Sequence, residues 1–183
     1  MPNRSRPRCR ERPAVIRADE HLVFVGLMGV GKTTVARVVA DRLGRRVFDS
    51  DAIIESRCGR TVREIFADDG EAAFRALETE VLLEALASTE PLVIAGAGGV
   101  VLSETNREAL KASGAKVVWL CADPATLADR VKSGGHRPLL DGDAAGTLQR
   151  MFNERESLYR EVADAIVLVD NRSVSDVVEA VLR

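Results

Sequence analysis

The glycine-rich segment GLMGVGKTT, at residues 26–34, constrains the fold of this chain more than any other feature of its sequence. It follows the apolar run HLVFVG at 21–26 and precedes an amphipathic stretch at 33–43, so it joins a predicted strand to a predicted helix. Its spacing matches G-x-x-x-x-G-K-[ST] at Gly26, Gly31, Lys32 and Thr33. Glycines allow backbone N–H groups to turn toward phosphate oxygens, and the helix N-terminus adds its positive end. The segment therefore predicts a strand–loop–helix unit that binds a nucleoside triphosphate.

Residues of this loop are expected to bind the phosphates and a metal ion. We expect Lys32 to neutralise the β- and γ-phosphates and the Thr33 hydroxyl to complete the coordination shell of Mg²⁺. The predicted ATP-binding residues of the loop are Gly29, Val30, Gly31, Lys32, Thr33 and Thr34. Mg²⁺, bound together with ATP, is the cofactor that this pattern predicts.

Short apolar runs alternate with amphipathic stretches along the rest of the chain. Further strands are predicted at 46–49, 91–96, 116–121 and 165–169, and further helices at 62–67, 70–87, 123–131, 145–162 and 174–182. The strands are apolar throughout, as in parallel strands that are covered on both faces. This order predicts an α/β fold, a three-layer sandwich with a central parallel five-stranded sheet and helices on both faces. A Gly- and Asp-rich segment at about 132–146 interrupts the rhythm, and we expect it to form a mobile lid.

The length of 183 residues suits one domain, which we place at 21–183. Residues 1–20 carry six arginines and three acidic residues, while the remainder carries 20 basic and 25 acidic residues. An acidic body argues against a nucleic-acid-binding surface, and the apolar runs are too short to span a membrane. Three widely spaced cysteines suit a reducing compartment. We therefore expect a cytoplasmic monomer whose partners are neither nucleic acids nor membranes.

The first 20 residues differ in composition from the domain that follows. Arginines and prolines dominate their first 13 positions, with almost no apolar residues. We expect a disordered extension at 1–20 that lies outside the fold. A nucleic-acid-binding tail and an organelle transit peptide are alternatives that this composition leaves open.

Two carboxylates, Asp49 and Asp51, lie at the end of the predicted strand at 46–49 and just after it. Parallel α/β sheets bind their ligands at the carboxyl ends of strands. In one interpretation, one carboxylate holds a Mg²⁺-bound water and the other contacts the hydroxyl group of a phosphate acceptor. In the other, the pair caps the N-terminus of a helix. The residues alone leave both interpretations open.

Three further groups of residues are candidates for an acceptor site. Arg75 and Glu78 lie three residues apart on a predicted helix, so the carboxylate can hold the guanidinium in place. An ordinary surface ion pair is the alternative. Gly98 and Gly99 follow a predicted strand, where their backbone N–H groups can approach a ligand closely. Arg155 lies on a predicted helix that carries many charged residues.

Taken together, these motifs resemble the shikimate kinase family, small P-loop kinases of the aromatic amino-acid pathway. Besides the P-loop, they are DSD at 49–51, FRALE at 74–78, the glycine turn at 96–99, RPLL at 137–140 and ERESLYREVAD at 154–164. The resemblance covers residues 21–182. It implies transfer of a phosphoryl group from ATP to the 3-hydroxyl of shikimate, which yields shikimate 3-phosphate and ADP on the route to chorismate. Departures from the family pattern occur at Ala97, Ser157 and Val174, and none of them removes a charged catalytic group.

The resemblance also implies roles for residues around the phosphates. The implied catalytic residues are Lys32, Asp51 and Arg137. Asp51 would bind ring hydroxyls and act as, or orient, the base, while Arg137 would move onto the phosphates with the lid. Asp49 would contact Mg²⁺ through water. Arg172 would lie beside the adenine, so that Arg137 and Arg172 complete the implied ATP-binding residues.

On the acceptor side, the resemblance implies a clamp for the shikimate carboxylate. Arg75 and Arg155 would bind that carboxylate, and Glu78 and Glu55 would orient Arg75. The implied substrate-binding residues are Asp51, Arg75, Gly98, Gly99 and Arg155. Shikimate and ATP are therefore the expected small-molecule partners.

Two other functions stay open on the sequence. A gluconate kinase or another small-molecule P-loop kinase would share the size and the phosphate loop, although a neutral sugar or a nucleotide does not need both Arg75 and Arg155. A nucleotide-binding regulator that has lost catalysis predicts damage at Asp51, Arg75 or Arg137, and all three residues are present.

Overall fold

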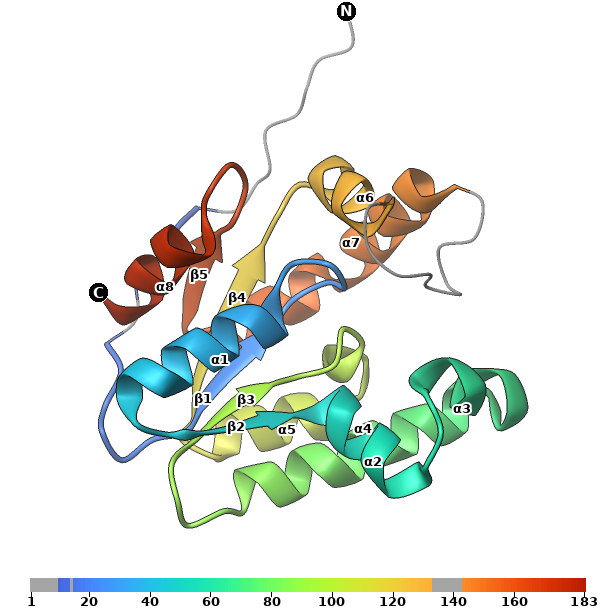
Figure 1. Cartoon of the computed structure of the whole chain (residues 1–183), viewed down its shortest axis with the longest axis horizontal. Coiled ribbons are helices and arrows are strands. Elements are labelled where there is room, and N and C mark those ends of the chain that lie inside the picture. Colours follow the sequence, from blue (N-terminus) through green and yellow to red (C-terminus); the bar gives the residue numbers. More distant parts are fainter. Residues whose placement is uncertain (1–9, 14, 133–142) are drawn as a thin grey trace, which may run out of the picture.

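The computed structural model describes residues 10–13, 15–132 and 143–183 (Figure 1). Its strands are β1 (Leu22–Val25), β2 (Arg46–Asp49), β3 (Leu92–Ala95), β4 (Lys116–Cys121) and β5 (Ala165–Leu168). Its helices are α1 (Lys32–Leu43), α2 (Ser50–Cys58), α3 (Val62–Asp68), α4 (Gly70–Leu86), α5 (Glu104–Ala112), α6 (Pro124–Lys132), α7 (Ala144–Val162) and α8 (Val174–Leu182), with a short 3₁₀ helix η1 (Val100–Leu102). All five predicted strands are confirmed within two residues at each end.

The five strands form one sheet of order β2-β3-β1-β4-β5, and every neighbouring pair is parallel. Figure 1 shows α1 and α8 on one face of the sheet, with α4, α5 and α7 on the other. The central strand β1 is completely buried, which explains why its sequence is apolar at every position. The predicted three-layer α/β sandwich with a parallel five-stranded sheet is confirmed. Its carboxyl edge brings together the loops that follow β1, β2 and β3.

Two helices, α2 and α5, escaped the sequence-based prediction. In α2 the buried residues are Ser50 and Ile54, and in α5 they are Asn106 and Leu110. In α2 the apolar stripe is too narrow for the helical period to stand out, whereas α5 is amphipathic and the prediction overlooked it. Both begin at side-chain caps, because Asp49 accepts from the N–H of Ala52 and Ser103 accepts from that of Asn106.

The segment predicted as a lid lies largely outside the described residues. Helix α6 ends at Lys132 and α7 begins at Ala144, where Asp143 caps it by accepting from the N–H of Gly146. The prediction of a lid is wrong at residues 144–146, which form the first turn of α7. The predicted catalytic residue Arg137 falls outside the described part of the chain.

Part of the N-terminal extension pairs with the edge of the sheet. The N–H of Arg12 donates to the carbonyl of Ile166 at 3.1 Å, and the N–H of Ile166 donates back at 3.0 Å. The Arg12 guanidinium also donates to the carbonyl of Ala163, and the Glu11 carboxylate accepts from Arg172 at 2.5 Å. This differs from the expectation that 1–20 lies outside the fold. The physical reason is that β5 is an edge strand, whose free backbone groups accept a further partner.

Replacing Arg12 with proline is expected to lower the free energy of unfolding by roughly 1–2 kcal/mol. The variant lacks the N–H that bonds to Ile166 and the guanidinium that bonds to Ala163. Urea unfolding followed by circular dichroism measures the difference. Arg10→Pro, which makes the same charge change two residues earlier, is the matched control. Equal free energies of unfolding for the two variants would contradict a stabilising role of this pairing.

Among the described residues, no helix combines the length and the apolar composition that crossing a membrane requires.

Candidate active site

The loop between β1 and α1 has the geometry of a phosphate cradle. Gly31 caps α1 with a φ of 98°, a left-handed conformation that a side chain would strain. The Lys32 ammonium lies over the loop and donates to the carbonyls of Gly26 at 2.8 Å and Leu27 at 3.2 Å. The positive charge of Lys32 and the N-terminal end of α1 therefore meet at one point.

A cavity of about 300 Å³, here called the phosphate cavity, opens beside this loop. The predicted ATP-binding residues that line it are Gly29, Gly31, Lys32, Thr33 and Thr34. Val30 differs, because its side chain is 2% exposed and packs in the core while its N–H bonds to the carbonyl of Leu27. Asp49 and Asp51 also line the phosphate cavity.

Thr33 and Asp49 form a pair of oxygen ligands suited to Mg²⁺. The Thr33 hydroxyl donates to Oδ2 of Asp49 at 2.6 Å. The other carboxylate oxygen of Asp49 accepts from the N–H of Ala52 at 3.1 Å and caps α2. The helix-cap interpretation is confirmed for Asp49, and the cap leaves its other oxygen toward the phosphate loop, so its contact with a Mg²⁺-bound water stays a prediction. Hydroxyl and carboxylate oxygens are the hard ligands that Mg²⁺ prefers, so these residues fit the ion.

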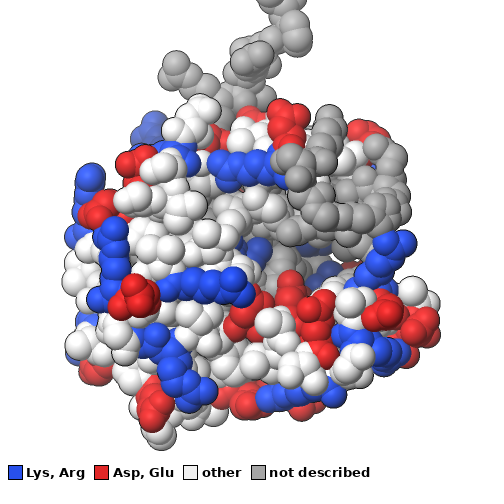
Figure 2. All heavy atoms as spheres, in the orientation of Figure 1, with Lys and Arg blue, Asp and Glu red and all other residues white. Residues whose placement is uncertain are grey.

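A second cavity of about 440 Å³, here called the acceptor cavity, adjoins the first. Its lining includes the predicted substrate-binding residues Asp51, Arg75, Gly98, Gly99 and Arg155. Asp51, Met28 and Gly98 line both cavities. Figure 2 shows a hollow on this face of the molecule, with acidic and basic side chains at its rim. The arrangement provides one space for a phosphorylated ligand and a neighbouring space for its acceptor, with a carboxylate at their boundary.

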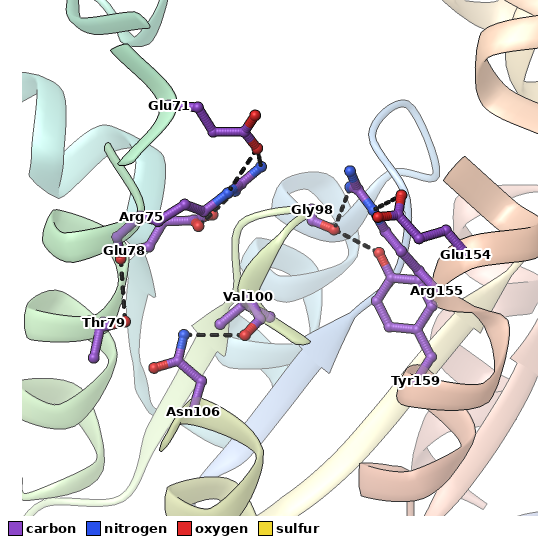
Figure 3. A network of polar contacts seen from close by, with 10 residues as sticks. All are labelled: Glu71, Arg75, Glu78, Thr79, Gly98, Val100, Asn106, Glu154, Arg155 and Tyr159. Atoms are coloured by element: carbon purple, nitrogen blue, oxygen red, sulfur yellow. Dashed lines mark hydrogen bonds and ion pairs between the residues drawn. The ribbon is translucent and has the colours of Figure 1, made fainter. Parts of the chain in front are cut away.

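Arg75 is held in the acceptor cavity by two carboxylates of its own helix. It donates to Glu78 at 2.5 Å and to Glu71 at 2.8 Å (Figure 3). Glu78 is only 1% exposed, and burial raises the pKa of its carboxyl group, while the neighbouring Arg75 opposes that rise. This direct contact supports the implied role of Glu78 in orienting Arg75. Glu55 differs, because its carboxylate accepts from the N–H of Val62 at 2.9 Å.

Arg155 and Tyr159, both on α7, fix the glycine turn from the opposite side of the cavity. The Arg155 guanidinium donates to the carbonyl of Gly98 at 3.1 Å, and the Tyr159 hydroxyl donates to the same oxygen at 2.5 Å. Arg155 is 6% exposed, and its Nε has no hydrogen-bond partner within the described chain. Figure 3 shows Arg75 and Arg155 on either side of Gly98. Two arginines that converge from opposite sides suit a carboxylate ligand.

Gly99→Ala is expected to raise the KM for the acceptor by about ten- to a hundredfold without unfolding the protein. A Cβ at this position would lie 2.0 Å from Nη1 of Arg75. The guanidinium is the flexible end of a side chain, so it would move, and the carboxylate clamp would lose its geometry. Steady-state kinetics with each substrate varied in turn measures the effect, and the KM for ATP serves as the internal control. An unchanged KM for the acceptor would contradict this role of the glycine.

Sequence reasoning missed several residues of the two cavities. Arg130 on α6 lines the phosphate cavity and donates to the carbonyl of Val169 at 3.1 Å. Arg63 on α3 lines the acceptor cavity, together with the apolar wall of Met28, Val62, Phe66, Phe74 and Ala97. A charged residue on a helix carries no local signal of the cavity that it faces.

Arg172, the predicted neighbour of the adenine, lies away from both cavities. It lines neither cavity and instead forms an ion pair with Glu11 at the far edge of the sheet. The implied contact with adenine therefore gains no support from this arrangement.

Comparison with known proteins identifies the family. A model of the family "Shikimate kinase" matches residues 28–183. A shikimate kinase from Symbiobacterium thermophilum is 46% identical over 165 residues, which cover 88% of this chain and 94% of the relative. A solved shikimate kinase from Acinetobacter baumannii, in complex with shikimate, superimposes with a TM-score of 0.83 at 37% identity, over 87% of this chain and 89% of that one.

A gluconokinase structure provides a contrast. The enzyme from Sinorhizobium meliloti 1021 has a TM-score of 0.60 at 24% identity over 91% of each chain, a likeness that shows the fold alone. The shikimate kinases combine similar coverage with higher sequence identity to this chain, 46% and 37% for the two described above. The chain therefore belongs to the shikimate kinase family and is an ATP-dependent kinase that phosphorylates a hydroxyl group.

Proposed function

We propose that the two cavities bind ATP and shikimate and that Asp51 receives the proton of the 3-hydroxyl as this oxygen attacks the γ-phosphate. The observation that carries this assignment is that Asp51 lines both cavities. A carboxylate at their boundary is within reach of a hydroxyl that faces a phosphoryl group. The products are shikimate 3-phosphate and ADP.

On the nucleotide side, the loop residues position and neutralise the phosphates. Lys32 releases the carbonyls of its own loop and turns its ammonium to the β- and γ-phosphates. Gly29, Gly31 and Thr33 line the phosphate cavity, and their backbone N–H groups would bind phosphate oxygens. Thr33 and Asp49 would hold Mg²⁺, Asp49 through water, and the bound ion supplies charge neutralisation on the phosphates. Phosphoryl transfer needs positioning and charge more than covalent help, and this site is built from both.

On the acceptor side, Arg75 and Arg155 bind the shikimate carboxylate from two directions. Glu71 and Glu78 hold the guanidinium of Arg75, and the carbonyl of Gly98 holds that of Arg155. The apolar wall of Phe66 and Phe74 suits the carbon ring of the substrate. An acidic polyol with a carbon ring therefore matches the charge and the lining of this cavity. The lid and Arg137 complete this proposal as predictions from the sequence.

A coupled assay of ADP release tests the proposal. Mg²⁺ATP is offered with shikimate, with gluconate, with a panel of nucleoside monophosphates, or alone. We expect turnover with shikimate only. Turnover with another acceptor and none with shikimate would overturn the carboxylate clamp as assigned, and bound ATP without any turnover would support the regulator.

A further inference from the structure

Arg63 is a third guanidinium at the acceptor cavity, and its setting differs from that of Arg75 and Arg155. It lies on α3, lines the cavity and is exposed to solvent. Arg75 is engaged by Glu71 and Glu78, and Arg155 lies 3.7 Å from Glu154. Within the described chain, Arg63 takes part in no ion pair and no side-chain hydrogen bond. Its charge is therefore available to a ligand.

The helix that carries Arg63 is fixed at its start. Thr61 and Glu64 form a capping box, in which the N–H of Thr61 donates to Glu64 at 2.7 Å and the N–H of Glu64 donates to Thr61 at 3.2 Å. Ile65 is fully buried and anchors the opposite face of the turn. The backbone of Arg63 thus has a defined position beside the cavity, while its side chain keeps its freedom to reach an incoming ligand.

The charges that line the acceptor cavity show why this residue matters. The carboxylates are those of Asp51, Glu55 and Glu78, and the guanidiniums are those of Arg63, Arg75 and Arg155. Counted this way, the lining is neutral with Arg63 and carries one excess negative charge without it. An anionic acceptor must approach Asp51 closely, so an excess of carboxylates would repel it.

We propose that Arg63 attracts the anionic acceptor into the cavity and determines the KM for that acceptor. The inference rests on the proposed function, because it takes the carboxylate of shikimate as the group that Arg63 attracts. The interaction acts at the mouth of the site and on the ground state. It therefore changes the capture of shikimate and leaves the phosphoryl transfer step as it is.

Arg63→Gln is the direct test of this role. We expect the KM for shikimate to rise about two- to fivefold at low salt and kcat to stay within about twofold, because an exposed charge pair is worth up to roughly 1 kcal/mol. The difference should shrink as the salt concentration rises, since salt screens partly exposed charges. Arg63→Lys should restore a KM close to that of the wild type, because it keeps the charge.

Two controls separate the charge of Arg63 from general effects. Arg60→Gln makes the same charge change three residues earlier, where the guanidinium is paired with Asp69 and does not line the cavity. We expect its KM for shikimate to match that of the wild type. The methyl ester of shikimate lacks the carboxylate charge, so wild type and Arg63→Gln should have the same KM for it, or the same Kd if it binds without turnover.

The outcomes are distinct for the two proposals. Equal KM values for shikimate in wild type and Arg63→Gln at low salt would overturn this inference and leave the proposed function intact. An equal rise for the methyl ester would overturn it as well, because that rise reports a loss of packing. Calorimetric titration with shikimate gives the same comparison without turnover. A wild-type chain that neither binds nor phosphorylates shikimate would overturn the proposed function first and this inference with it.

Discussion

Asp51→Asn is expected to lower kcat for shikimate by about 10²–10⁴-fold, the range that a positioned general base contributes. The amide has the shape of the carboxylate, so the walls of both cavities that Asp51 lines stay in place. It cannot accept the hydroxyl proton as the oxygen attacks. The KM for ATP should change little, because the loop residues that hold the phosphates are untouched.

Initial rates of ADP release at saturating ATP measure this effect, and titration with ATP verifies that the variant still binds nucleotide. Asp41→Asn is the matched control, since this aspartate lies exposed on α1 and lines neither cavity. We expect the control to retain the kcat of the wild type. An Asp51→Asn variant whose kcat falls less than tenfold would show that another group receives the proton.

Much of the fold was predictable because local and tertiary signals agree in it. The strands are short, apolar and separated by amphipathic helices, and only a parallel sheet with two covered faces accommodates that pattern. Helix α2 has a weak amphipathic pattern, with the polar residue Ser50 buried, whereas α5 is amphipathic and begins at the cap Ser103, so it could have been predicted. Pairing of the extension with β5 was hidden, because Arg12 and Ile166 are far apart in the chain and nothing in an Arg-rich segment indicates a sheet edge.

Only part of the candidate site could be predicted from the sequence. Lys32, Thr33 and Asp49 could be assigned from sequence because a loop and a strand end fix their places. The contact between Arg75 and Glu78 follows from helical spacing alone. Arg63 and Arg130 were missed. Which face of a helix lines a cavity depends on how the helices pack, and the local sequence does not show that packing. The role of Arg172 beside the adenine stays a prediction, and its ion pair with Glu11, 161 residues away, carries no signal in the sequence.

The second large effect is expected at Arg155, where alanine should lower kcat/KM for shikimate by about 10²-fold. The guanidinium is buried, and its Nε lacks a hydrogen-bond partner among the described residues, so a carboxylate in the acceptor cavity would supply an acceptor for a buried donor. Hydrogen bonds to charged groups contribute roughly 1.5–3 kcal/mol, which sets this magnitude. The Tyr159 hydroxyl still holds the carbonyl of Gly98, so the glycine turn should keep its place.

The variant Arg155→Lys should recover little of the activity that Arg155→Ala loses. A single ammonium cannot bond the carbonyl of Gly98 and present a second donor to a carboxylate in the way that the planar guanidinium of Arg155 does. Arg160→Ala is the matched control on the same helix, because Arg160 pairs with Glu156, lies against Trp119 and lines neither cavity. Steady-state kinetics with shikimate varied at saturating ATP compares the three variants. If Arg155→Ala keeps the wild-type KM and kcat for shikimate, the carboxylate binds elsewhere, and the buried donor then serves the glycine turn alone.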